Sequence, residues 1–339
     1  MAVIAGIDEA GYGPLLGPLV VSAAAFEVPD SAAHDDLWLR LAPAVSRSTR
    51  DPDRLPVDDS KRLFTQSIGL RHIERTALAF AAAAGCPSRD SLAPITLASR
   101  EIRRLMVPGT NRDTFRGLLA ALAEMREEVD SYPWHRGADF PLPLAADAAQ
   151  VEPDAERLHA VPGTRFLGAR CLPVLVGEYN HLVECHGTKS ATLFLKTAHL
   201  LTRLWRDWGE AGLIVHADKH GGRNRYGLLL HQTFLGARIR TLAEGPKESL
   251  YTVADGARRM TIGFYERGDA RHLPVALASI FSKYLRELFM HSFNAWWCER
   301  VPGLRPTAGY VTDGRRWLGD TASARARLGI PDHLLIRIA

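Results

Sequence analysis

Two adjacent carboxylates, Asp8 and Glu9, stand where an apolar run near the start of the chain gives way to a glycine-rich turn. The apolar run covers residues 3–7, the turn covers 11–14, and a second apolar run covers 18–26. A short apolar segment bounded by turn residues is typical of a buried strand. Two charges at the end of such a strand are costly unless they bind something. The alternative is a β-hairpin whose two acids are simply exposed to solvent.

Two further acids occupy similar places. Asp218 ends the apolar run 213–217, and Asp269 precedes a long apolar segment. Carboxylates gathered at one end of a sheet, without Cys or His, suit Mg²⁺ or Mn²⁺. Two such ions about 4 Å apart activate a water and stabilise the leaving oxygen of a phosphodiester. Neighbouring residues on a regular strand point to opposite faces, so Asp8 and Glu9 share one site only if their strand ends there.

The composition is that of an ordinary globular protein. The chain has 339 residues, of which 46% are hydrophobic and 24% charged, and its net charge is +4. This mild basicity is compatible with a polyanionic partner. The four cysteines lack CxxC or CxxH spacing, which disfavours a zinc site and a disulfide framework. No signal peptide or membrane-spanning run is predicted, so we expect a cytoplasmic protein without membrane association.

The elements that would position these acids follow from apolar periodicity. The hairpin at the start is followed by one or two strands over 165–180, a strand over 213–218, a strand over 237–242 and a hairpin over 251–269. The predicted helices are 60–84, 91–106, 112–129, 189–208, 226–234, 273–298 and 320–328. Residues 131–163 lack periodicity and are rich in Pro, which indicates a surface excursion or an insertion. Alternating strands and helices with an antiparallel hairpin favour a mixed-sheet α/β core over an all-parallel sheet.

The segment Ile7–Val20 resembles the signature of type 2 ribonuclease H, a DEAGRGPxxGP pattern. Gly268–Arg286 is similar to a second specific motif of that family, in which a Gly-Asp pair precedes an apolar helix with a Ser and a Lys. Weaker matches follow the family's order along the chain: Asp59–Leu63, Glu178–Asn180, Ala308–Thr312 and Pro331–His333.

The resemblance implies an RNase H-like α/β fold, with a mixed five-stranded sheet flanked by helices, insertions and a C-terminal helical extension. The chain would be a single catalytic domain over 1–339. Residues 86–163 would form the insertion, and 290–339 the extension that completes the substrate site.

The resemblance also implies an activity. Asp8, Glu9, Asp218 and Asp269 would be the catalytic acids and hold two Mg²⁺ or Mn²⁺ ions. The substrate would be the RNA strand of an RNA–DNA hybrid or a ribonucleotide embedded in DNA. Hydrolysis would leave a 3′-hydroxyl and a 5′-phosphate, and the enzyme is expected to act as a monomer.

Substrate contacts are expected from the turn, two lysines and a tyrosine. Small residues let the backbone approach the 2′-hydroxyl, which distinguishes RNA from DNA, and lysines contact phosphates. Lys61 could instead be an ordinary surface lysine, Lys283 could snorkel from its apolar helix, and Tyr310 could be a half-buried tyrosine. The residues are Gly11, Tyr12, Gly13, Lys61, Lys283 and Tyr310. Three nearby histidines are expected to be structural: His216, His220 and His272.

Three departures from the family pattern matter. Tyr12 replaces an arginine expected near the scissile phosphate, and tyrosine cannot supply its charge. Asp218 is followed by an added basic loop, which could compensate for the lost arginine; its cations are Lys219, Arg223 and Arg225. Asp269 follows Asp218 by 51 positions, which indicates an inserted hairpin and makes Asp255 a rival fourth ligand.

Tyr12 keeps two alternatives open. One is a nuclease of the same fold with a different nucleic-acid target. The other is a module that keeps the fold and clamps nucleic acid without cutting it.

Overall fold

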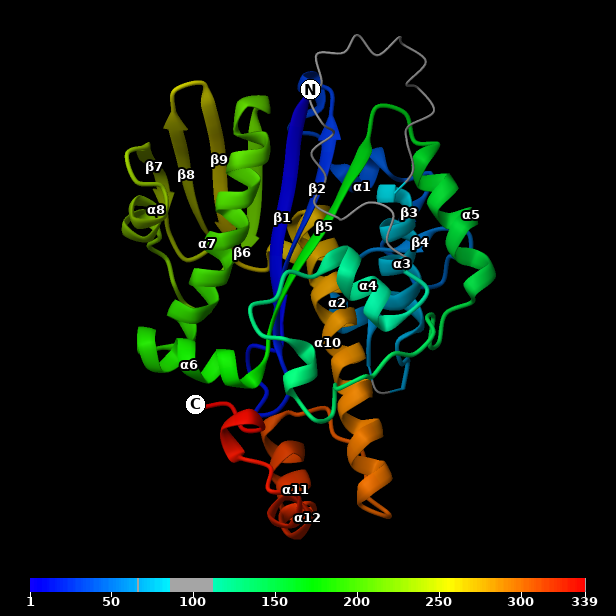
Figure 1. Cartoon of the computed structure of the whole chain (residues 1–339). Coiled ribbons are helices and arrows are strands. Elements are labelled where there is room, and N and C mark those ends of the chain that lie inside the picture. The colour runs from blue at the N-terminus through cyan, green and yellow to red at the C-terminus, as the bar shows by residue number, and fades with distance from the viewer. Residues whose placement is uncertain (66, 86–111, 339) are drawn as a thin grey trace.

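A seven-stranded sheet forms the centre of the chain (Figure 1), in a computed structural model that describes residues 1–65, 67–85 and 112–338. Its strands are β1 (Ala2–Ala10), β2 (Leu19–Val28), β5 (Arg165–Val174), β6 (Leu213–Asp218), β7 (Arg238–Glu244), β8 (Glu248–Asp255) and β9 (Arg258–Tyr265). The order across the sheet is β5-β2-β1-β6-β9-β8-β7. β6 runs parallel to β1 and β9 parallel to β6, while the other pairs are antiparallel.

The mixed α/β sheet expected from the sequence is confirmed, and it is wider than expected. The strands β5-β2-β1-β6-β9 make up the five-stranded mixed sheet that the resemblance implies. β8 and β7 extend it by two strands, and both lie between Asp218 and Asp269 in the chain. The long spacing of these two acids is therefore filled by added sheet. Two short strands, β3 (Val45–Ser46) and β4 (Leu55–Pro56), pair separately.

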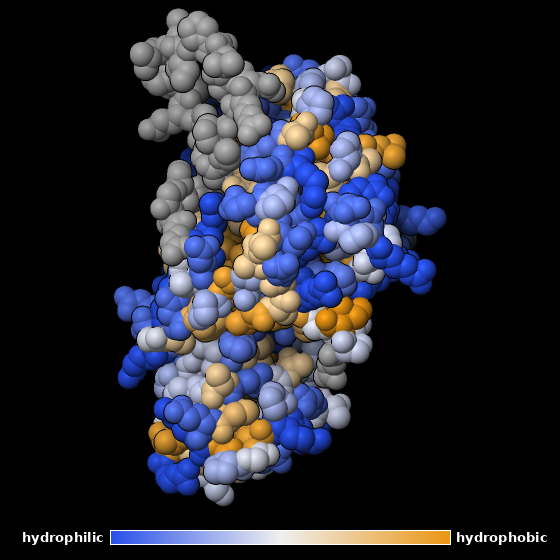
Figure 2. Space-filling model, turned by 90° about the vertical axis from the view of Figure 1, so that its right-hand side faces the viewer, coloured by the Kyte–Doolittle hydropathy of each residue, from blue (hydrophilic) through white to orange (hydrophobic). Residues whose placement is uncertain are grey.

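Several helices match their predicted ranges. They are α7 (Lys189–Trp208), α8 (Gly227–Thr233), α10 (Leu273–Arg300) and α12 (Ala322–Leu328). The helix α1 (Leu37–Arg40) coincides with a short amphipathic piece of the sequence around residues 37–41, whereas α9 (Gly268–Arg271) and α11 (Val311–Asp320) were not predicted. Within the described residues, no helix has the length and apolar character needed to cross a bilayer. The face shown in Figure 2 is largely hydrophilic, with apolar side chains in small separate groups.

The single helix predicted over 60–84 is wrong, because two helices occupy this range. They are α2 (Ser60–Leu63) and α3 (Arg71–Gly85). Phe64 adopts an extended conformation after α2. Gly69 has a φ of 66°, which lies in the left-handed region and cannot continue a right-handed helix. The helix predicted over 91–106 lies outside the described residues.

The helix predicted over 112–129 is shorter, because α4 (Phe115–Leu122) ends where the chain turns to the edge of the sheet. Ala123 is extended and forms a β-bridge with Cys171 of β5. The N–H of Glu124 donates to the Cys171 carbonyl at 2.9 Å. Pairing with a strand edge therefore outcompetes the helical pattern of this segment.

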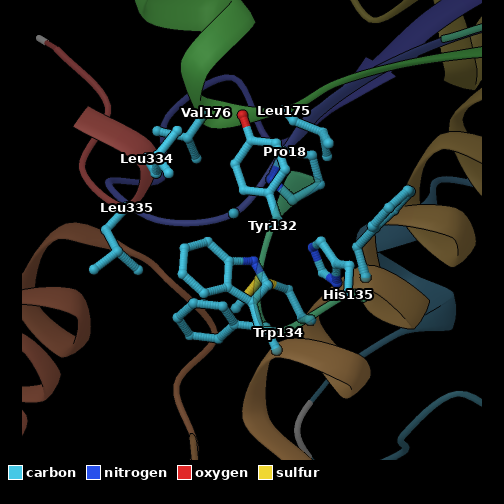
Figure 3. A pocket seen from close by; sticks show the side chains of 12 residues that line it. Pro18, Tyr132, Trp134, His135, Leu175, Val176, Leu334 and Leu335 are labelled. Carbon is cyan, nitrogen blue, oxygen red and sulfur yellow. The ribbon is translucent and has the colours of Figure 1, made fainter. Parts of the chain in front are cut away.

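The stretch 131–163 was predicted to be irregular, but it contains α5 (Ala148–His159). Pro153 lies inside this helix and hides it from sequence patterns. The helix is held to α3 by a buried pair, in which Arg75 Nε donates to Asp154 Oδ2 at 2.6 Å. Earlier in the stretch, Tyr132, Trp134 and His135 surround a cavity of about 10 Å³ (Figure 3).

The strands predicted over 165–180 are β5 followed by a helix, α6 (Val176–His186). Glu178–Asn180 therefore lies on a helix, contrary to the strand expectation. Apolar residues continue from β5 into the first turn of α6, so composition alone does not show the change of element.

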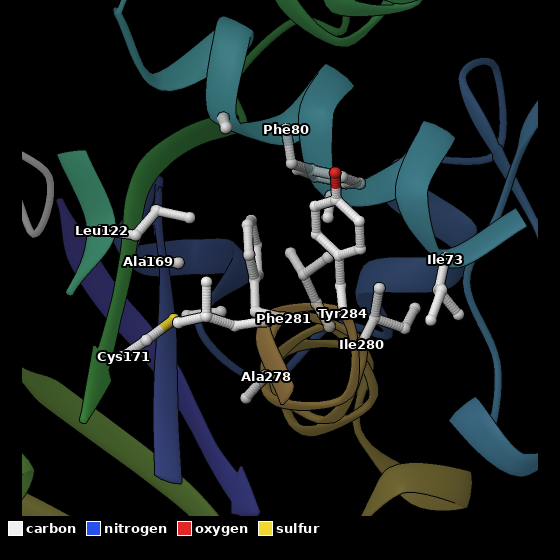
Figure 4. Packing of buried hydrophobic residues seen from close by; sticks show 14 of the residues in the cluster. Ile73, Phe80, Leu122, Ala169, Cys171, Ala278, Ile280, Phe281 and Tyr284 are labelled. Atoms are coloured by element: carbon white, nitrogen blue, oxygen red, sulfur yellow. The ribbon is translucent and has the colours of Figure 1, made fainter. Parts of the chain in front are cut away.

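Helices cover both faces of the sheet, so alternate residues of β1 are buried in two different cores. Ile4 belongs to the core that β2 and β5 share with α3 and α10. Figure 4 shows part of this layer, with Phe80 of α3 above Phe281 of α10. Ile7 belongs to the opposite core, which includes residues of α6 and α7. A central strand buried on both faces reads as a continuous apolar run.

The close approach of α10 to β1 depends on Gly6. A Cβ atom at this position would lie 2.1 Å from the carbonyl carbon of Pro274, in the first turn of α10. A side chain here would force the helix away from the strand. Gly6 therefore allows the start of α10 to pack closely against the middle of β1, two residues before Asp8.

Candidate active site

Asp8 and Glu9 lie near the C-terminal end of β1, as predicted, but the strand does not stop at them: they pair with Ser22 and Val21 of β2, and β1 continues to Ala10. The N–H of Glu9 donates to Asp8 Oδ1 at 2.8 Å. Ser282 of α10 donates to the Asp8 carbonyl oxygen at 3.2 Å, and to the Ser22 hydroxyl of β2 at 2.7 Å. Asp8 is 8% exposed. The strand end is thus fixed by the helix that packs closely on it.

Asp218 lies at the same end of the sheet as Asp8, called the acidic edge below, because β6 runs parallel to β1. Ala217 pairs with Ile7, so the next residues of the two strands end side by side. Asp218 Oδ1 accepts the N–H of Gly268 at 2.7 Å. A Cβ atom at Gly268 would lie 3.3 Å from this carboxylate oxygen, so glycine leaves room for the contact.

Asp269 lies on α9, directly after β9. Arg267, which precedes this helix, has a φ of 55° and is the one non-glycine residue with positive φ in the part of the chain that the structure describes. Such strained residues concentrate at functional sites. The short helix places Asp269 beside the end of β6, where the preceding Gly268 donates to Asp218.

Asp255 is excluded as the rival fourth ligand. Tyr265, the last residue of β9, pairs with Asp218, whereas Asp255 pairs with Arg258 at the first residue of β9. Seven residue steps at about 3.3 Å each separate the two ends of β9 by roughly 23 Å. Asp255 therefore lies at the opposite end of the strands from Asp218.

The four acids of this edge share one electrostatic environment. Burial raises the pKa of Asp8 well above its usual value, and repulsion from Glu9 and Asp218 adds to the rise. Burial and then Asp218 raise the pKa of Glu9 to about 8. Burial also raises the pKa of Asp218 to about 6, with a further contribution from Asp269. Ionising all four carboxyl groups together is therefore unfavourable without a compensating cation.

The donor chemistry fits a hard divalent cation. Carboxylate oxygens are the ligands that Mg²⁺ and Mn²⁺ prefer. In the conformation shown, no group of three or more His, Cys, Asp or Glu side chains within 1–65, 67–85 and 112–338 is arranged so that it could hold a metal ion. The carboxylates would therefore have to turn toward one another to coordinate an ion.

Lys61 lies beside this group of acids. It follows Asp59, whose side chain caps α2 by accepting the Lys61 N–H at 2.9 Å. The charge of Lys61 partly offsets the rise that burial causes in the pKa of three acids, which are Glu9, Asp218 and Asp269. Asp59 also belongs to this group of acids, because after burial it contributes most to the raised pKa of Asp269. Sequence reasoning did not select it as a site acid.

Tyr310 lies near the turn at residues 11–13, because Arg286 of α10 contacts both Gly11 and the Tyr310 ring. Gly309 accepts the N–H groups of Leu15 and Leu16 at 2.8 and 3.1 Å. Gly11 has a φ of 86°, and a Cβ atom there would lie 2.5 Å from the Pro18 carbonyl oxygen. Tyr310 is 52% exposed, so its ring is available on the surface next to the turn.

Lys283 and the histidines are less available. Lys283 Nζ pairs with Glu287 Oε1 at 2.7 Å and lies 4.2 Å from the centroid of the Phe64 ring. The rings of His216 and His272 are stacked, with centroids 3.8 Å apart. Burial lowers the pKa of His216 to about 3 and that of His272 to about 4, which keeps both neutral.

The basic loop after Asp218 does not place all of its cations where the missing arginine would be, because Lys219 and Arg223 bind other groups of the protein. Lys219 is buried, and its ammonium donates to Asn224 Oδ1 at 2.7 Å and to the Pro246 carbonyl at 3.0 Å. Arg223 donates to the Ser190 hydroxyl at 3.1 Å and partly offsets the rise that burial causes in the pKa of Tyr12. Arg286 of α10 lies against Gly11, and the cation that donates hydrogen bonds to the turn is Arg337, whose guanidinium donates to the carbonyls of Gly11 and Tyr12.

Sequence reasoning missed Arg337. The nearest signal is the weak match at Pro331–His333, which ends four positions earlier. Nothing in the spacing connects this arginine with a turn near the other end of the chain.

Comparisons with known proteins give matches to ribonucleases named HII, H2 and HIII. No family model matches the chain. The crystal structure of ribonuclease H2 from Pyrococcus horikoshii aligns over 98% of this chain and 92% of its own, at 13% identity and a TM-score of 0.42. Bst-RNase HIII in complex with Mn²⁺ aligns over 99% of this chain and 66% of its own, at 12% identity and a TM-score of 0.42.

A separate match was found by sequence. It covers 49 residues, which are 14% of this chain and 20% of the length of a curated protein. The two stretches are 39% identical. The protein that this part of the chain resembles is ribonuclease HII from Methanococcus maripaludis.

Proposed function

We propose that this chain is a metal-dependent endoribonuclease of the type 2 ribonuclease H kind. Its substrate is the RNA strand of an RNA–DNA hybrid or a ribonucleotide embedded in duplex DNA. Hydrolysis leaves a 3′-hydroxyl and a 5′-phosphate. One observation carries the proposal: the parallel strands β1 and β6 end side by side and bring Asp8, Glu9 and Asp218 together, α9 begins against Asp218, and Asp218 raises the pKa of both Asp8 and Glu9.

In this proposal Asp8, Glu9, Asp218 and Asp269 hold two Mg²⁺ or Mn²⁺ ions. When bound, the ions supply an activated water and neutralise charge on the leaving oxygen. The protein orients the acids: the Gly268 N–H fixes Asp218, and a hydroxyl of α10 fixes the backbone of Asp8.

The substrate is held by residues around the acids. Lys61 is exposed and contacts a phosphate. Tyr310 stacks on a sugar beside the scissile bond. Gly11 and Gly13 let the turn approach the 2′-hydroxyl, and a Cβ position at Gly13 has no atom within 4 Å. Lys283 reaches a phosphate only after it leaves Glu287.

The test uses four labelled duplexes with Mg²⁺ or Mn²⁺: RNA–DNA hybrid, DNA with one ribonucleotide, all-DNA and all-RNA. Cleavage of a ribonucleotide-containing duplex alone is expected. Cleavage of all-DNA or of all-RNA alone would instead indicate a nuclease with another target. Binding of the duplexes without any cleavage would contradict the hydrolase and indicate a binding module.

A matched pair of variants identifies the acids. Asp218→Asn is expected to abolish cleavage and leave duplex binding largely intact, because the amide cannot supply the anionic ligand. Asp255→Asn makes the same change at the opposite end of β9 and is expected to have no effect. Calorimetric titration with Mn²⁺ should show weakened binding for Asp218→Asn alone. Unchanged turnover of Asp218→Asn would contradict the assignment.

A further inference from the structure

Arg337 places a buried positive charge behind the turn formed by Gly11, Tyr12 and Gly13. The turn itself has no charged residue, yet the guanidinium of Arg337 donates from Nη1 to the Gly11 carbonyl and from Nη2 to the Tyr12 carbonyl, the latter at 3.3 Å. The whole residue is 3% exposed. The arginine therefore acts from inside the protein and does not extend into solvent.

Asn180 of α6 fixes the segment that carries Arg337. Its Nδ2 donates to the carbonyls of His333 and Ile336 at 3.0 and 2.8 Å, and its Oδ1 accepts the Ile338 N–H at 2.9 Å. One side chain thus holds backbone groups on both sides of Arg337. The segment is positioned independently of the guanidinium.

Two further contacts support this segment. The N–H of Arg337 donates to the Leu15 carbonyl at 3.0 Å, so the segment lies along the chain just after the turn. Leu334 and Leu335 line the small cavity beside Tyr132 (Figure 3). The segment is therefore anchored by backbone pairing as well as by apolar packing.

The surroundings of the guanidinium are unusual for a buried charge. It lies 3.8 Å from the centroid of the Tyr179 ring, a cation–π distance. No carboxylate among the described residues forms a salt bridge with it, and its Nε has no hydrogen-bond partner there. Burial lowers the pKa of Arg337, as expected for a charge that lacks an acidic partner. A costly charge of this kind calls for a role other than stability.

The two carbonyl contacts fix which way the turn faces. The described chain has one cis peptide bond, between Leu142 and Pro143, so the peptides after Gly11 and Tyr12 are trans. In a trans peptide the N–H points away from the C=O. The N–H groups of Tyr12 and Gly13 therefore point away from Arg337. Neither donates a hydrogen bond to another described residue, and the Cβ position of Gly13 is open.

We propose that Arg337 is a positioning residue for this turn. It holds the two carbonyls on the inner side, so that the N–H groups of Tyr12 and Gly13 face the sugar–phosphate backbone of the substrate. It also returns to the turn the positive charge that Tyr12 does not carry. The inference rests on the proposed function for the identity of the substrate, but not for the ordering of the turn.

The test compares three variants. Arg337→Ala removes the charge and both hydrogen bonds. Arg337→Lys keeps the charge but lacks the planar fork that reaches two carbonyls. Arg327→Ala makes the same truncation at an exposed arginine of α12 and serves as the control. Thermal unfolding shows whether each variant is folded.

The first measurement is ¹⁵N relaxation of the Tyr12 and Gly13 amides in the protein without substrate. For Arg337→Ala we expect their order parameters to fall from about 0.85 to below about 0.6, and for Arg337→Lys to an intermediate value. Unchanged order parameters in folded Arg337→Ala would overturn the proposal. If Arg337→Ala does not fold, Arg337→Lys decides: a loosened turn supports the proposal and an unchanged one overturns it.

The second measurement is kcat and KM on a duplex with one ribonucleotide. We expect kcat/KM of Arg337→Ala to fall at least about tenfold, with partial recovery in Arg337→Lys and no change in Arg327→Ala. An equal loss in both alanine variants would overturn the role at the turn. If the wild-type protein cleaves no duplex, the proposed function fails, and the relaxation measurement still decides the positioning.

Discussion

The raised pKa of Glu9 makes the stability of the metal-free protein depend on pH. In the folded protein burial and then Asp218 raise this pKa from 4.5 to about 8. Between these values the folded state keeps a proton that the unfolded state has released. The contribution of Glu9 to the free energy of unfolding is therefore fully present below pH 4.5 and is lost as the pH rises toward 8.

The size of the loss follows from the interval. Each pH unit costs about 1.36 kcal/mol, so an interval of about 3.5 units corresponds to about 5 kcal/mol. Asp218, with a pKa raised by burial from 3.8 to about 6, acts in the same direction over the lower part of this range. The two carboxyl groups interact, so their contributions do not simply add. A loss of this size is a large share of the stability of a typical domain.

The assay is urea unfolding at several pH values between 4.5 and 8, once with EDTA and once with Mn²⁺. With EDTA the free energy of unfolding should fall as the pH rises. With Mn²⁺ the fall should largely disappear, because a cation that binds the ionised carboxylates stabilises the folded state.

Two variants isolate the cause. Glu9→Gln removes one titrating group and should reduce the dependence measured with EDTA, leaving the part that comes from Asp8 and Asp218. Asp255→Asn removes an acid at the far end of β9 and should leave the dependence unchanged. A wild-type stability that stays constant from pH 5 to pH 8 in EDTA would refute the reasoning about the buried acids.

Three further predictions concern packing and specificity. Gly6→Ala should destabilise the protein by at least about 3 kcal/mol in urea unfolding, because its Cβ overlaps the backbone of α10, whereas Gly222→Ala, in open space, should change stability by less than about 0.5 kcal/mol. Tyr12→Arg should raise the ratio of kcat/KM for ribonucleotide-containing over all-DNA duplex, and an unchanged ratio would contradict a role for the missing charge. Arg75→Ala should cost about 2 kcal/mol in the same unfolding assay by leaving a buried carboxylate with one cation, and adding Asp154→Ala should recover part of the loss.

The sequence was most informative where one strand and one residue type coincide. Asp8 and Asp218 each lie near the end of a short apolar run bounded by turn residues, a pattern typical of a buried strand. Because β1 and β6 are parallel and in register, their ends meet, and the structure brings the predicted acids together. Asp269 was also selected from the residues alone, because it precedes a long apolar segment, and the resemblance to type 2 ribonuclease H favoured it over Asp255.

The failures have a common physical cause, since each depends on contacts between distant segments. α5 contains Pro153 and is stabilised by the buried pair of Arg75 and Asp154, which lie 79 positions apart. The helical pattern after Leu122 yields to a bridge with β5. Arg337 belongs to the same class, because its partners are known only once the sheet and α6 are in place.

The contact between Arg337 and the turn also has a consequence for biosynthesis. The hydrogen bond to Tyr12 joins residues 325 positions apart. During translation the four acids emerge before residue 337, so a nascent chain can build the acidic edge while its turn is still unconstrained. Contacts of such long range form late in folding. A truncated or nicked chain that has lost residue 337 would keep the acidic edge and lack the ordered turn, so full competence would arise only after residue 337 has been synthesised.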